Sequence, residues 1–505
     1  MSSLQDTIAG LSEGTKAFLS RSKGLLINNE FKNAASGKTF AMIDAVSEET
    51  ISVVPEGDAI DIDRAVDAAT TAFKENSEWR NMTPYQRQQL MLKLADLMEA
   101  HAAELAEIEA LDVGKSVIFA RIIDVDSTIE YLRYMAGWAT KIEGKTLNVS
   151  LQSPPGLGMQ FHAFTLREPI GVCGGIIPWN FPLAMAIWKL SPALAAGCCC
   201  VLKPAEQACL SVFRLGELIV EAGFPPGVIN IVSGYGETAG RALVIHPAVH
   251  KIAFTGSTEV GKQIGKYCAD AVKHVSLELG GKSPVIALND ANVDAVVAGA
   301  MQAIFFNSGQ VCTAGSRLYV QRGKYEAVLQ ALATATQSIR IGSGFDPANT
   351  LGPMVSQAQQ DRVLGFVAQG VEEGGTVLCG GSKITGKGYF MEPTIFCNVK
   401  QSDTIMQSEI FGPVVIVTPF DTIDEAVEMA NNVTYGLAAS IFSNDLSKVH
   451  RLIPRIQAGT VWVNTHNMID PSMPFGGYKE SGIGREMGID AVHMYTETKS
   501  VLMNV

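Results

Sequence analysis

A single cysteine lies among small residues in the stretch FFNSGQVCTAGSR, residues 305–317. Gly309, Thr313 and Gly315 are close to Cys312 in the chain, whereas a cysteine that only fills a core usually has bulky neighbours. A cysteine thiolate is a strong nucleophile, and small neighbours leave room for a substrate to reach the sulfur. The stretch alone leaves two interpretations open, a core filler and a nucleophile.

The carboxylate of Glu278 is placed for acid–base chemistry in the stretch LELGGKSP, residues 277–284. It stands between Leu277 and Leu279 at the end of a predicted strand. Burying a lone carboxylate raises its pKa toward the range that suits a general base. The alternative is a carboxylate on the exposed face of an edge strand.

Two glycine-containing stretches could hold a phosphate group. FTGSTEVG, residues 254–261, follows a predicted strand and opens a helix whose first turn carries Ser257, Thr258 and Glu259. A helix N-terminus preceded by glycines suits a pyrophosphate, although an ordinary capped helix shows the same pattern. GYGETAG, residues 234–240, has one residue too many for the G-x-G-x-x-G fingerprint and gives only weak support.

A lysine and a carboxylate follow another predicted strand. The stretch VLKPAEQA, residues 201–208, places Lys203 and Glu206 just beyond the carboxyl end of that strand, where α/β sheets bind ligands. A carboxylate there can accept both hydroxyls of an adenosine ribose and would repel a 2′-phosphate, which favours NAD over NADP. The alternative is a surface ion pair in a loop.

The elements expected to position these residues alternate between strand and helix. Residues 168–280 and 281–482 each contain short apolar runs separated by helical stretches, which indicates two α/β domains with parallel sheets. Residues 84–115 carry strong helix formers with apolar residues at three- and four-residue intervals, typical of a helix. Residues 144–168 and 495–505 fit neither domain and predict exposed strands, which pair readily with another chain.

The composition indicates a large protein with reduced thiols. The 505 residues carry a net charge of −12, which suggests two or three domains and argues against a nucleic-acid surface. No signal peptide or membrane span is indicated, because Lys189 and Pro192 interrupt the apolar segment 184–204, and a cytoplasmic protein is expected. The nine cysteines are an odd number, which argues against a disulfide framework. Those in GCCCV, residues 197–201, lack the spacing of metal ligands and are expected in the core, and no metal site is predicted.

Seven motifs, taken in order, resemble those of the NAD(P)-dependent aldehyde dehydrogenase superfamily over nearly the whole chain. They are IPWNFP (177–182), KPAE (203–206), FTGSTEVG (254–261), LELGGKSP (277–284), FNSGQVCTAG (306–315), SEIFGPV (408–414) and PFGGYKESGIGRE (474–486). The resemblance implies an α/β fold with a Rossmann-like cofactor domain, an α/β catalytic domain and a small β oligomerisation arm. The implied NAD-binding domain is 1–143 and 168–280, the catalytic domain 281–482, and the oligomerisation segments 144–167 and 483–505.

The resemblance implies that Cys312 is a nucleophile that attacks an aldehyde carbon. The side-chain amide of Asn180 and the backbone N–H of Cys312 would hold the resulting oxyanion. Glu278 would act as the general base on the water that hydrolyses the thioester to a carboxylic acid. Members of the superfamily that pass the acyl group to coenzyme A lack this base, so water is the expected acceptor.

The cofactor implied by the resemblance is NAD. Its adenosine ribose would lie on Glu206, its pyrophosphate near Ser257 and its nicotinamide ribose on Glu409. The full expected cofactor-binding set is Ile176, Ile177, Pro178, Trp179, Lys203, Ala205, Glu206, Gly236, Phe254, Gly256, Ser257, Val260, Leu279, Glu409 and Phe411. Many relatives have a lysine near the position of Arg362, and a cofactor contact of this arginine is left open.

The predicted substrate pocket is rich in aromatic residues, which suit an arylalkyl group. The expected substrate-binding residues are Phe181, Met185, Trp188, Phe306, Val311, Thr313, Ile469 and Phe475. Residues 161–197 are most similar to the bacterial phenylacetaldehyde dehydrogenases, which implies oxidation of phenylacetaldehyde to phenylacetate. Arg317 is the sole arginine near the predicted mouth, which disfavours an anionic semialdehyde, whereas Asp470 leaves open a broad-range aliphatic or aminoaldehyde dehydrogenase.

Two other classes of protein compete with this interpretation. One is a non-catalytic structural protein of the same fold, and the other is a thiol esterase that needs no cofactor. Cys312, Glu278 and Asn180 together argue against the first, and the nucleotide-site motifs argue against the second. The expected partners are an aldehyde substrate and further copies of the chain, arranged as a tetramer built from two dimers, without nucleic acid or membrane.

Overall fold

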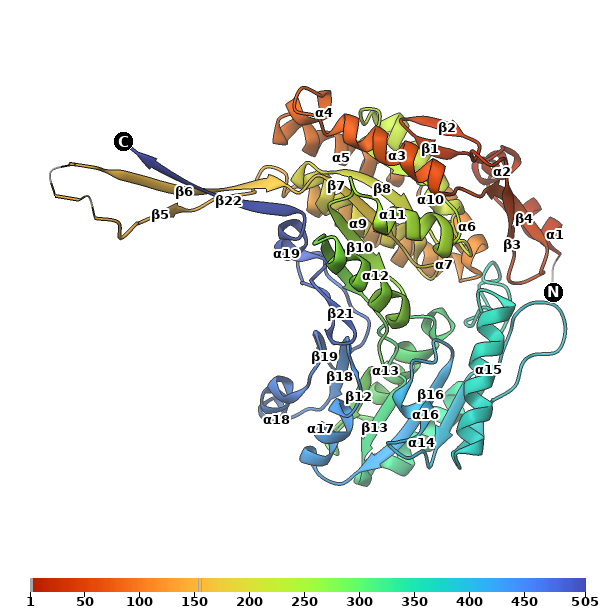
Figure 1. Ribbon diagram of the computed structural model, residues 1–505. Helices are drawn as coiled ribbons and strands as arrows, with labels where there is room; N and C mark the ends of the chain where they lie inside the picture. The colour runs from red at the N-terminus through yellow and green to blue at the C-terminus, as the bar shows by residue number, and fades with distance from the viewer. Residues whose placement is uncertain (1–2, 153, 156) are drawn as a thin grey trace.

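The chain folds into two α/β lobes and a β arm that projects from them (Figure 1). The computed structural model describes residues 3–152, 154–155 and 157–505. The first lobe contains an eight-stranded sheet, the second a seven-stranded sheet and the arm a three-stranded sheet. This architecture agrees with the predicted α/β class. No helix in the described ranges is both long and apolar enough to cross a membrane.

The sheet of the first lobe has the strand order β2-β1-β9-β8-β7-β10-β11-β21. Its strands are β1 (Leu25–Ile27), β2 (Glu30–Lys32), β7 (Val172–Ile176), β8 (Cys199–Lys203), β9 (Ile229–Ile231), β10 (Lys251–Thr255), β11 (His274–Glu278) and β21 (Gly482–Ile483). The five central strands, from β9 to β11, run parallel as predicted. The chain adds β8 and β9 on one side of β7 and then crosses to add β10 and β11 on the other. In such sheets, ligands bind at the carboxyl ends of the two strands between which the order of strand addition reverses. Here those strands are β7 and β10, so this topology places a site beyond their carboxyl ends.

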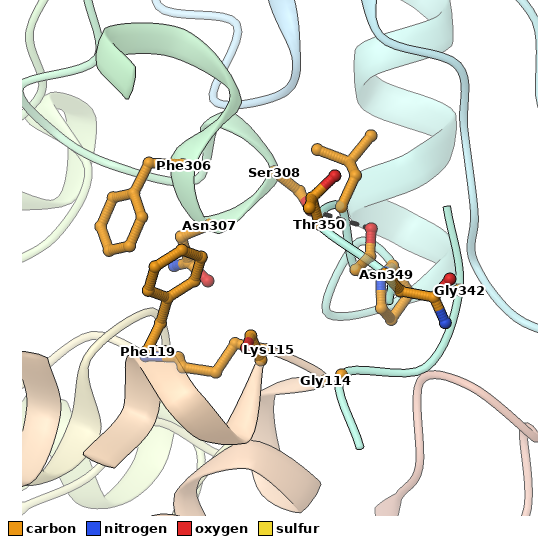
Figure 2. A pocket seen from close by; sticks show the side chains of 14 residues that line it. Gly114, Lys115, Phe119, Phe306, Asn307, Ser308, Gly342, Asn349 and Thr350 are labelled. Carbon is orange, nitrogen blue, oxygen red and sulfur yellow. Dashed lines mark hydrogen bonds between the residues drawn. The ribbon is translucent and has the colours of Figure 1, made fainter. Parts of the chain in front are cut away.

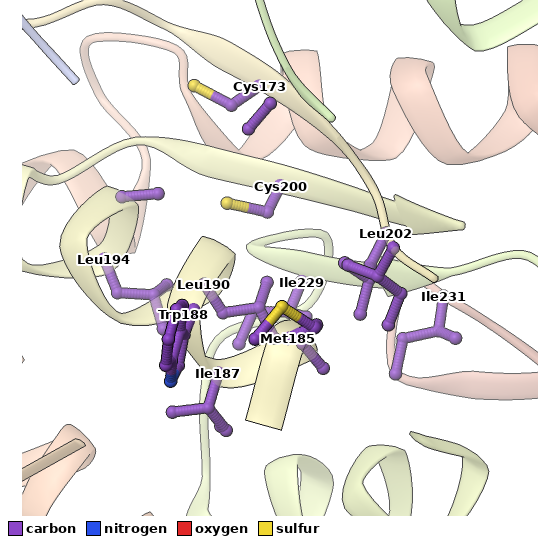
Figure 3. Packing of buried hydrophobic residues seen from close by; sticks show 14 of the residues in the cluster. Cys173, Met185, Ile187, Trp188, Leu190, Leu194, Cys200, Leu202, Ile229 and Ile231 are labelled. Carbon is purple, nitrogen blue, oxygen red and sulfur yellow. The ribbon is translucent and has the colours of Figure 1, made fainter. Parts of the chain in front are cut away.

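Helices cover both faces of this sheet. Those nearest the strands are α3 (Ala59–Ala72), α9 (Pro182–Ala196), α10 (Leu210–Ala222), α11 (Arg241–Ile245), α12 (Thr258–Asp270) and the π-helical turn η2 (Gly236–Gly240). Helix α9 begins with Pro182 in its first turn and ends before Gly197, whose φ of 92° suits glycine. Cys173 and Cys200 project from β7 and β8 into an apolar core with Met185, Trp188 and Leu190 of α9 (Figure 3). The core-filling role predicted for the GCCCV cysteines is thereby confirmed.

The N-terminal region packs helices and a hairpin around the first lobe. Its elements are α1 (Leu4–Gly10), α2 (Glu13–Ser20), β3 (Thr39–Ile43), β4 (Thr50–Pro55), α4 (Glu78–Asn81), α5 (Pro84–Ala100), α6 (Ala102–Val113), α7 (Val117–Phe119), η1 (Ala120–Asp126) and α8 (Ser127–Ala136). The helical pattern predicted over residues 84–115 is confirmed, and the structure divides it into α5 and α6, because the chain leaves the helical region at His101, with φ −107° and ψ 18°. The His101 ring instead lies against the Glu104 carboxylate, 2.8 Å away.

The second lobe contains a sheet in the order β14-β15-β16-β13-β12-β18-β19, parallel except for the β14–β15 edge. Its strands are β12 (Pro284–Ala287), β13 (Arg317–Gln321), β14 (Thr376–Cys379), β15 (Thr394–Cys397), β16 (Val414–Phe420), β18 (Ala438–Phe442) and β19 (Thr460–Val463). Its helices are α13 (Val293–Phe305), η3 (Phe306–Gly309), α14 (Arg322–Gln337), α15 (Gln357–Glu372), α16 (Thr404–Gln407), α17 (Ile423–Asn431), α18 (Leu446–Leu452) and η4 (Ile453–Arg455). The short pair β17 (Tyr435–Gly436) and β20 (Tyr478–Lys479) lies beside it. This second parallel sheet was expected from the alternation after residue 281.

The arm consists of β5 (Thr146–Leu147), β6 (Phe161–Pro169) and β22 (Thr496–Asn504), in the order β22-β6-β5. The two segments predicted as exposed strands therefore pair with each other in one chain, and positions 153 and 156 lie outside the described residues. Residues 483–495, assigned above to an oligomerisation segment, differ from the arm: Ile483 pairs with Leu277 of the first sheet, and α19 (Gly488–His493) packs against α9. In the ranges that the structure describes, no strand pairs with the other side of β22.

Candidate active site

Three loops from the two lobes bring Asn180, Glu278 and Cys312 into one region. Asn180 follows β7, Glu278 is the last residue of β11, and Cys312 lies between η3 and β13. Close backbone packing joins them, since a Cβ placed on Gly281 would lie 2.3 Å from the carbonyl oxygen of Cys312. A Cβ on Gly476 would lie 2.8 Å from Oε1 of Glu278. Only glycines allow the chain to approach the backbone of Cys312 and the carboxylate of Glu278 this closely.

Cys312 is a partly exposed residue, and its thiol lies beside two carboxylates. Burial in the loop raises its pKa to about 12, and the negative charges of Glu409 and Glu278 act in the same direction. The backbone N–H groups of Thr313 and Cys312 point toward the sulfur and oppose this shift. The side chain is therefore a thiol at neutral pH, and its proton must leave before it can attack a carbonyl.

The rate of Cys312 alkylation by iodoacetamide in the protein without ligands is expected to rise about tenfold per pH unit from about pH 7 to about pH 10. The reason is that only the thiolate reacts, and its fraction keeps growing below a pKa near 12. Timed quenching followed by mass spectrometry of the Cys312 peptide measures this rate separately from that of the half-buried Cys379. A plateau in the Cys312 rate below about pH 9 would contradict the raised pKa.

The Glu278 side chain is 4% exposed, and within the described chain neither carboxylate oxygen has a hydrogen-bond partner. Burial raises its pKa well above the usual value, and the nearby Glu486 carboxylate adds to the effect. The cations of Lys189 and Arg485 act in the opposite direction without cancelling it. The prediction of a buried carboxylate with a raised pKa is confirmed, and the exposed-edge alternative is wrong.

Asn180 is 4% exposed, and its side chain spans the gap between the lobes. Its Nδ2 donates to the carbonyl oxygen of Gln310 at 2.9 Å, in the loop that carries Cys312. A carboxamide nitrogen has two N–H donors, so this bond fixes the amide and leaves a second donor. The amide is thus oriented at the nucleophile loop with one N–H to spare.

The predicted cofactor-binding residues gather at the carboxyl ends of the first sheet. Strand β7 ends at Ile176 and is followed by Ile177, Pro178 and Trp179, and β8 ends at Lys203 and is followed by Ala205 and Glu206. The connection from β10 to α12 runs from Phe254 through Gly256 and Ser257 to Val260. Leu279 follows β11, and Gly236 is the first residue of η2. Lys203 is buried and its Nζ lies 3.1 Å from Oε2 of the half-buried Glu206. Ser257 caps the 13-residue helix α12 by accepting from the N–H of Val260. Lys203 and Glu206 therefore form an ion pair, and this pair lies at the carboxyl end of β8, where α/β sheets bind ligands.

Two further predicted cofactor-binding residues come from the second lobe. The ring of Phe411 meets that of Trp179 edge-on at a centroid distance of 5.2 Å, and Phe411 holds a φ of 60°, which is strained for a non-glycine residue. Oε1 of Glu409 accepts from the N–H of Gly281 at 3.0 Å, and burial raises the pKa of Glu409 to about 7. Arg362 donates to the carbonyl oxygen of Glu409 at 3.3 Å, so the arginine left open above does reach this segment.

The predicted substrate-binding residues form two aromatic pairs. Phe181 stacks on Phe306 at 6.2 Å between centroids, and Trp188 meets Phe475 at 5.6 Å. Met185 and Val311 are also buried, whereas Ile469 is 46% exposed and lies on the surface.

Three polar residues near the predicted mouth point elsewhere. The Thr313 hydroxyl donates to Oδ1 of Asn467 at 2.7 Å, so it is bonded within the second lobe. Arg317 is buried and donates to the carbonyl oxygens of Lys282, Met429 and Ala430. Asp470 accepts from the backbone N–H of Ser472, two residues further along the chain. The polar groups of these three residues are therefore hydrogen-bonded within the protein.

The sequence profile of the aldehyde dehydrogenase family matches residues 31–501. The chain belongs to the aldehyde dehydrogenase family. It is 50% identical over 481 residues to the phenylacetaldehyde dehydrogenase of Pseudomonas fluorescens, covering 95% of both chains. It is 47% identical over 482 residues to retinal dehydrogenase 2 of Mus musculus, covering 95% of this chain and 92% of the other.

Solved structures of aldehyde dehydrogenases share the whole architecture. An NAD⁺ complex of aldehyde dehydrogenase from Bacillus cereus has a TM-score of 0.95 at 47% identity, covering 98% of this chain and 99% of the other. These matches confirm the family resemblance and the fold class predicted from the motifs. The protein is an enzyme of the aldehyde dehydrogenase class.

Several residues of this aldehyde dehydrogenase site are absent from the predicted set. Lys189 donates to the Thr255 hydroxyl at 2.5 Å and pairs with Glu486, so an ion pair lies beside Glu278. His466 is fully buried and holds the Thr313 carbonyl oxygen at 2.8 Å through Nε2. A charged or imidazole residue inside an apolar motif, such as Lys189 in AIWKLSP, is the signal that could have marked them.

Proposed function

We propose that this protein oxidises phenylacetaldehyde to phenylacetate with NAD as the oxidant and water as the acyl acceptor. The observation that carries the mechanism is the convergence of a thiol, an unpaired buried carboxylate and an oriented amide at Cys312, Glu278 and Asn180. These are the groups that nucleophilic attack, water activation and oxyanion binding require.

The residues along the first sheet fit a dinucleotide. The N–H groups in the first turn of α12, next to the exposed Ser257, suit a pyrophosphate. Glu206 and Glu409 present carboxylates from the two lobes, as two ribose groups require. Gly280 leaves space that a Cβ would close, at 2.3 Å from Oε2 of Glu409. Bound along the carboxyl ends of the first sheet, NAD would supply the two-electron acceptor for the oxidation step.

Each catalytic side chain has one task. The Cys312 thiolate forms a C–S bond to the aldehyde carbon, and the carbonyl π electrons move to oxygen. The second N–H of Asn180 and the backbone N–H of Cys312 stabilise that oxyanion. After oxidation to a thioester, Glu278 takes a proton from water, which attacks the acyl carbon, and the C–S bond breaks to release the acid and the thiolate.

The substrate assignment is supported by the aromatic walls and by the 50% identical relative named for phenylacetaldehyde. An aryl ring can pack edge-on or offset against such walls, whereas a small or cationic aldehyde gains little from them. A broad-range aliphatic or aminoaldehyde dehydrogenase is the second candidate, favoured by the 46% exposed Ile469 and the carboxylate of Asp470 near the outer surface.

Oligomer formation through the arm is part of this proposal. Leu166 and Leu502 are 43% and 51% exposed on the arm, and in the described part of the chain no strand pairs with the outer edge of β22. Exposed apolar strands with a free edge favour pairing with another chain. We place the NAD-binding domain at 1–143 and 168–280 and the catalytic domain at 281–482, with the arm joining cytoplasmic protomers into a tetramer of two dimers.

The specificity constant for phenylacetaldehyde with NAD is expected to exceed that for acetaldehyde by about tenfold or more, since apolar contacts of a few carbons change kcat/KM by roughly 10- to 200-fold. NADH formation with phenylacetaldehyde, hexanal, acetaldehyde and betaine aldehyde, in parallel with NAD and NADP, measures this preference. Equal constants across these aldehydes would remove the substrate assignment and leave a general aldehyde dehydrogenase. No NAD reduction with any aldehyde would favour the non-catalytic alternative, and faster ester hydrolysis without NAD would favour the esterase.

A further inference from the structure

A buried lysine outside the predicted site contacts the backbone of Asn180. Lys115 follows α6 and is 6% exposed. Its Nζ donates to the Asn180 carbonyl oxygen at 2.8 Å and to Oδ1 of Asp124 at the same distance. The ammonium also lies 4.3 Å from the centroid of the Phe181 ring. One side chain thus holds both the residue that carries the amide donor and the next residue along the chain.

The surroundings of Lys115 are costly to bury. Glu109 and Asp124 are both at most 1% exposed, and Oε1 of Glu109 lies 3.8 Å from Nζ. Burial raises the pKa of both carboxyls, and the Lys115 cation opposes this shift. Within the described chain, both oxygens of Glu109 and one oxygen of Asp124 lack a hydrogen-bond partner. Such a cluster is a weak source of stability, because apolar residues of similar volume serve as well or better.

Asn180 is held from both lobes. Lys115 fixes its carbonyl oxygen from the first lobe, while Nδ2 of Asn307 lies 3.4 Å from the same oxygen from the second. Figure 2 shows Lys115 and Phe119 on one wall of a pocket and Asn307 on the facing wall. The Asn180 amide then reaches Gln310, two residues before the nucleophile. The line of contacts from Lys115 ends at the amide that faces the nucleophile loop.

We propose that Lys115, held by Asp124, is a positioning residue that sets the Asn180 amide for oxyanion binding. This inference rests on the proposed role of Asn180 as an oxyanion donor. Oxyanion donors act only when they are placed before the charge develops, and a small displacement removes most of their effect. Loss of the Lys115 contact therefore slows attack on a carbonyl without changing the thiol itself.

The test uses the neutral pair Lys115→Met with Asp124→Asn, in the parent enzyme and in an Asn180→Ala background. The single-turnover rate of NADH formation is expected to fall by about 10- to 100-fold in the parent, less than the about 10²- to 10³-fold loss of an oxyanion donor itself. In the Asn180→Ala background the same pair should cost no more than about twofold, because residues that act through one group are not additive. Alkylation of Cys312 by iodoacetamide, which forms no oxyanion, should stay within about twofold.

Two further variants guard against a merely structural effect. Lys115→Arg keeps a cationic donor and is expected to be faster than the neutral pair. Lys251→Met removes another buried lysine, which bonds to Ser276 at the opposite end of β10, and should leave the single-turnover rate unchanged.

The outcomes separate the inference from the proposed function beneath it. Equal losses in both backgrounds, a parallel fall in alkylation, or no loss in the parent overturn the role of Lys115 alone. A parent-like rate for Asn180→Ala overturns the oxyanion role of Asn180 and the inference with it. Absence of NAD reduction by the unaltered enzyme overturns the proposed function as a whole.

Discussion

Replacing Cys312 by alanine is expected to lower kcat for aldehyde oxidation by about 10⁴-fold or more, with no NADH formed in the first turnover. Removal of a covalent nucleophile abolishes the intermediate on which every later step depends, and losses of this size follow. The affinity for NAD should be unchanged, because the residues at the ends of β7, β8 and β10 remain in place. Stopped-flow absorbance of NADH and titration of protein fluorescence with NAD measure the two quantities.

A matched variant, Cys379→Ala, removes a half-buried thiol on β14 of the second sheet and should retain the parent rate. Activity surviving in Cys312→Ala would overturn the nucleophile assignment. Loss of activity in both variants would show instead that the second lobe tolerates no cysteine replacement, and the assignment would lose its support.

The residues that could be predicted well from the sequence are those whose environment is determined by their neighbours in the chain. Glu278 stands between two leucines at a strand end, and its burial and raised pKa follow from that placement. Cys312 is flanked by small residues, and the structure leaves the residue partly exposed. The parallel order of the central sheet follows from the alternation of strands and helices, so the edge that gathers the predicted cofactor residues could be located before the fold was known.

The residues that were missed act across long separations in the chain. Lys189 meets Glu486 and Lys115 meets Asn180, and neither pair has a spacing that local periodicity could reveal. Phe119 meets Phe306 at 5.6 Å between centroids from a helix in the other lobe. Such contacts depend on how distant parts of the chain pack together. The hydrophobic pattern of a single helix or strand does not specify this packing.

The electrostatics of the site link its two ionisable centres. Burial raises the pKa of the Cys312 thiol to about 12, and burial together with the Glu486 carboxylate raises the pKa of Glu278 well above its usual value. Each negative charge opposes the other, since Glu278 raises the pKa of Cys312. Both groups act in their deprotonated forms, and both pKa values are raised, so we expect turnover to rise with pH as the carboxyl of Glu278 ionises.

Glu278→Gln is expected to lower steady-state kcat by about 10³-fold while leaving a first-turnover release of NADH close to one equivalent per active site. The amide cannot take a proton from water, so the thioester on Cys312 accumulates instead of being hydrolysed. Rapid-quench mass spectrometry should detect the acyl adduct on the Cys312 peptide. Glu13→Gln, at a carboxylate that is 91% exposed, serves as the control and should behave as the parent.

Two additional measurements make the Glu278 result specific to water activation. Hydroxylamine attacks a thioester without a protein base, so it should restore turnover of Glu278→Gln and yield the hydroxamate of the substrate acid.

The pH dependence of kcat offers the second test. The raised pKa means that the base form of Glu278 becomes populated only as pH increases, so parent kcat should rise through that range and the variant's residual rate should not follow the same curve. If the first-turnover NADH also disappears and hydroxylamine restores nothing, Glu278 is needed before the thioester forms, and its assignment as the hydrolytic base is wrong.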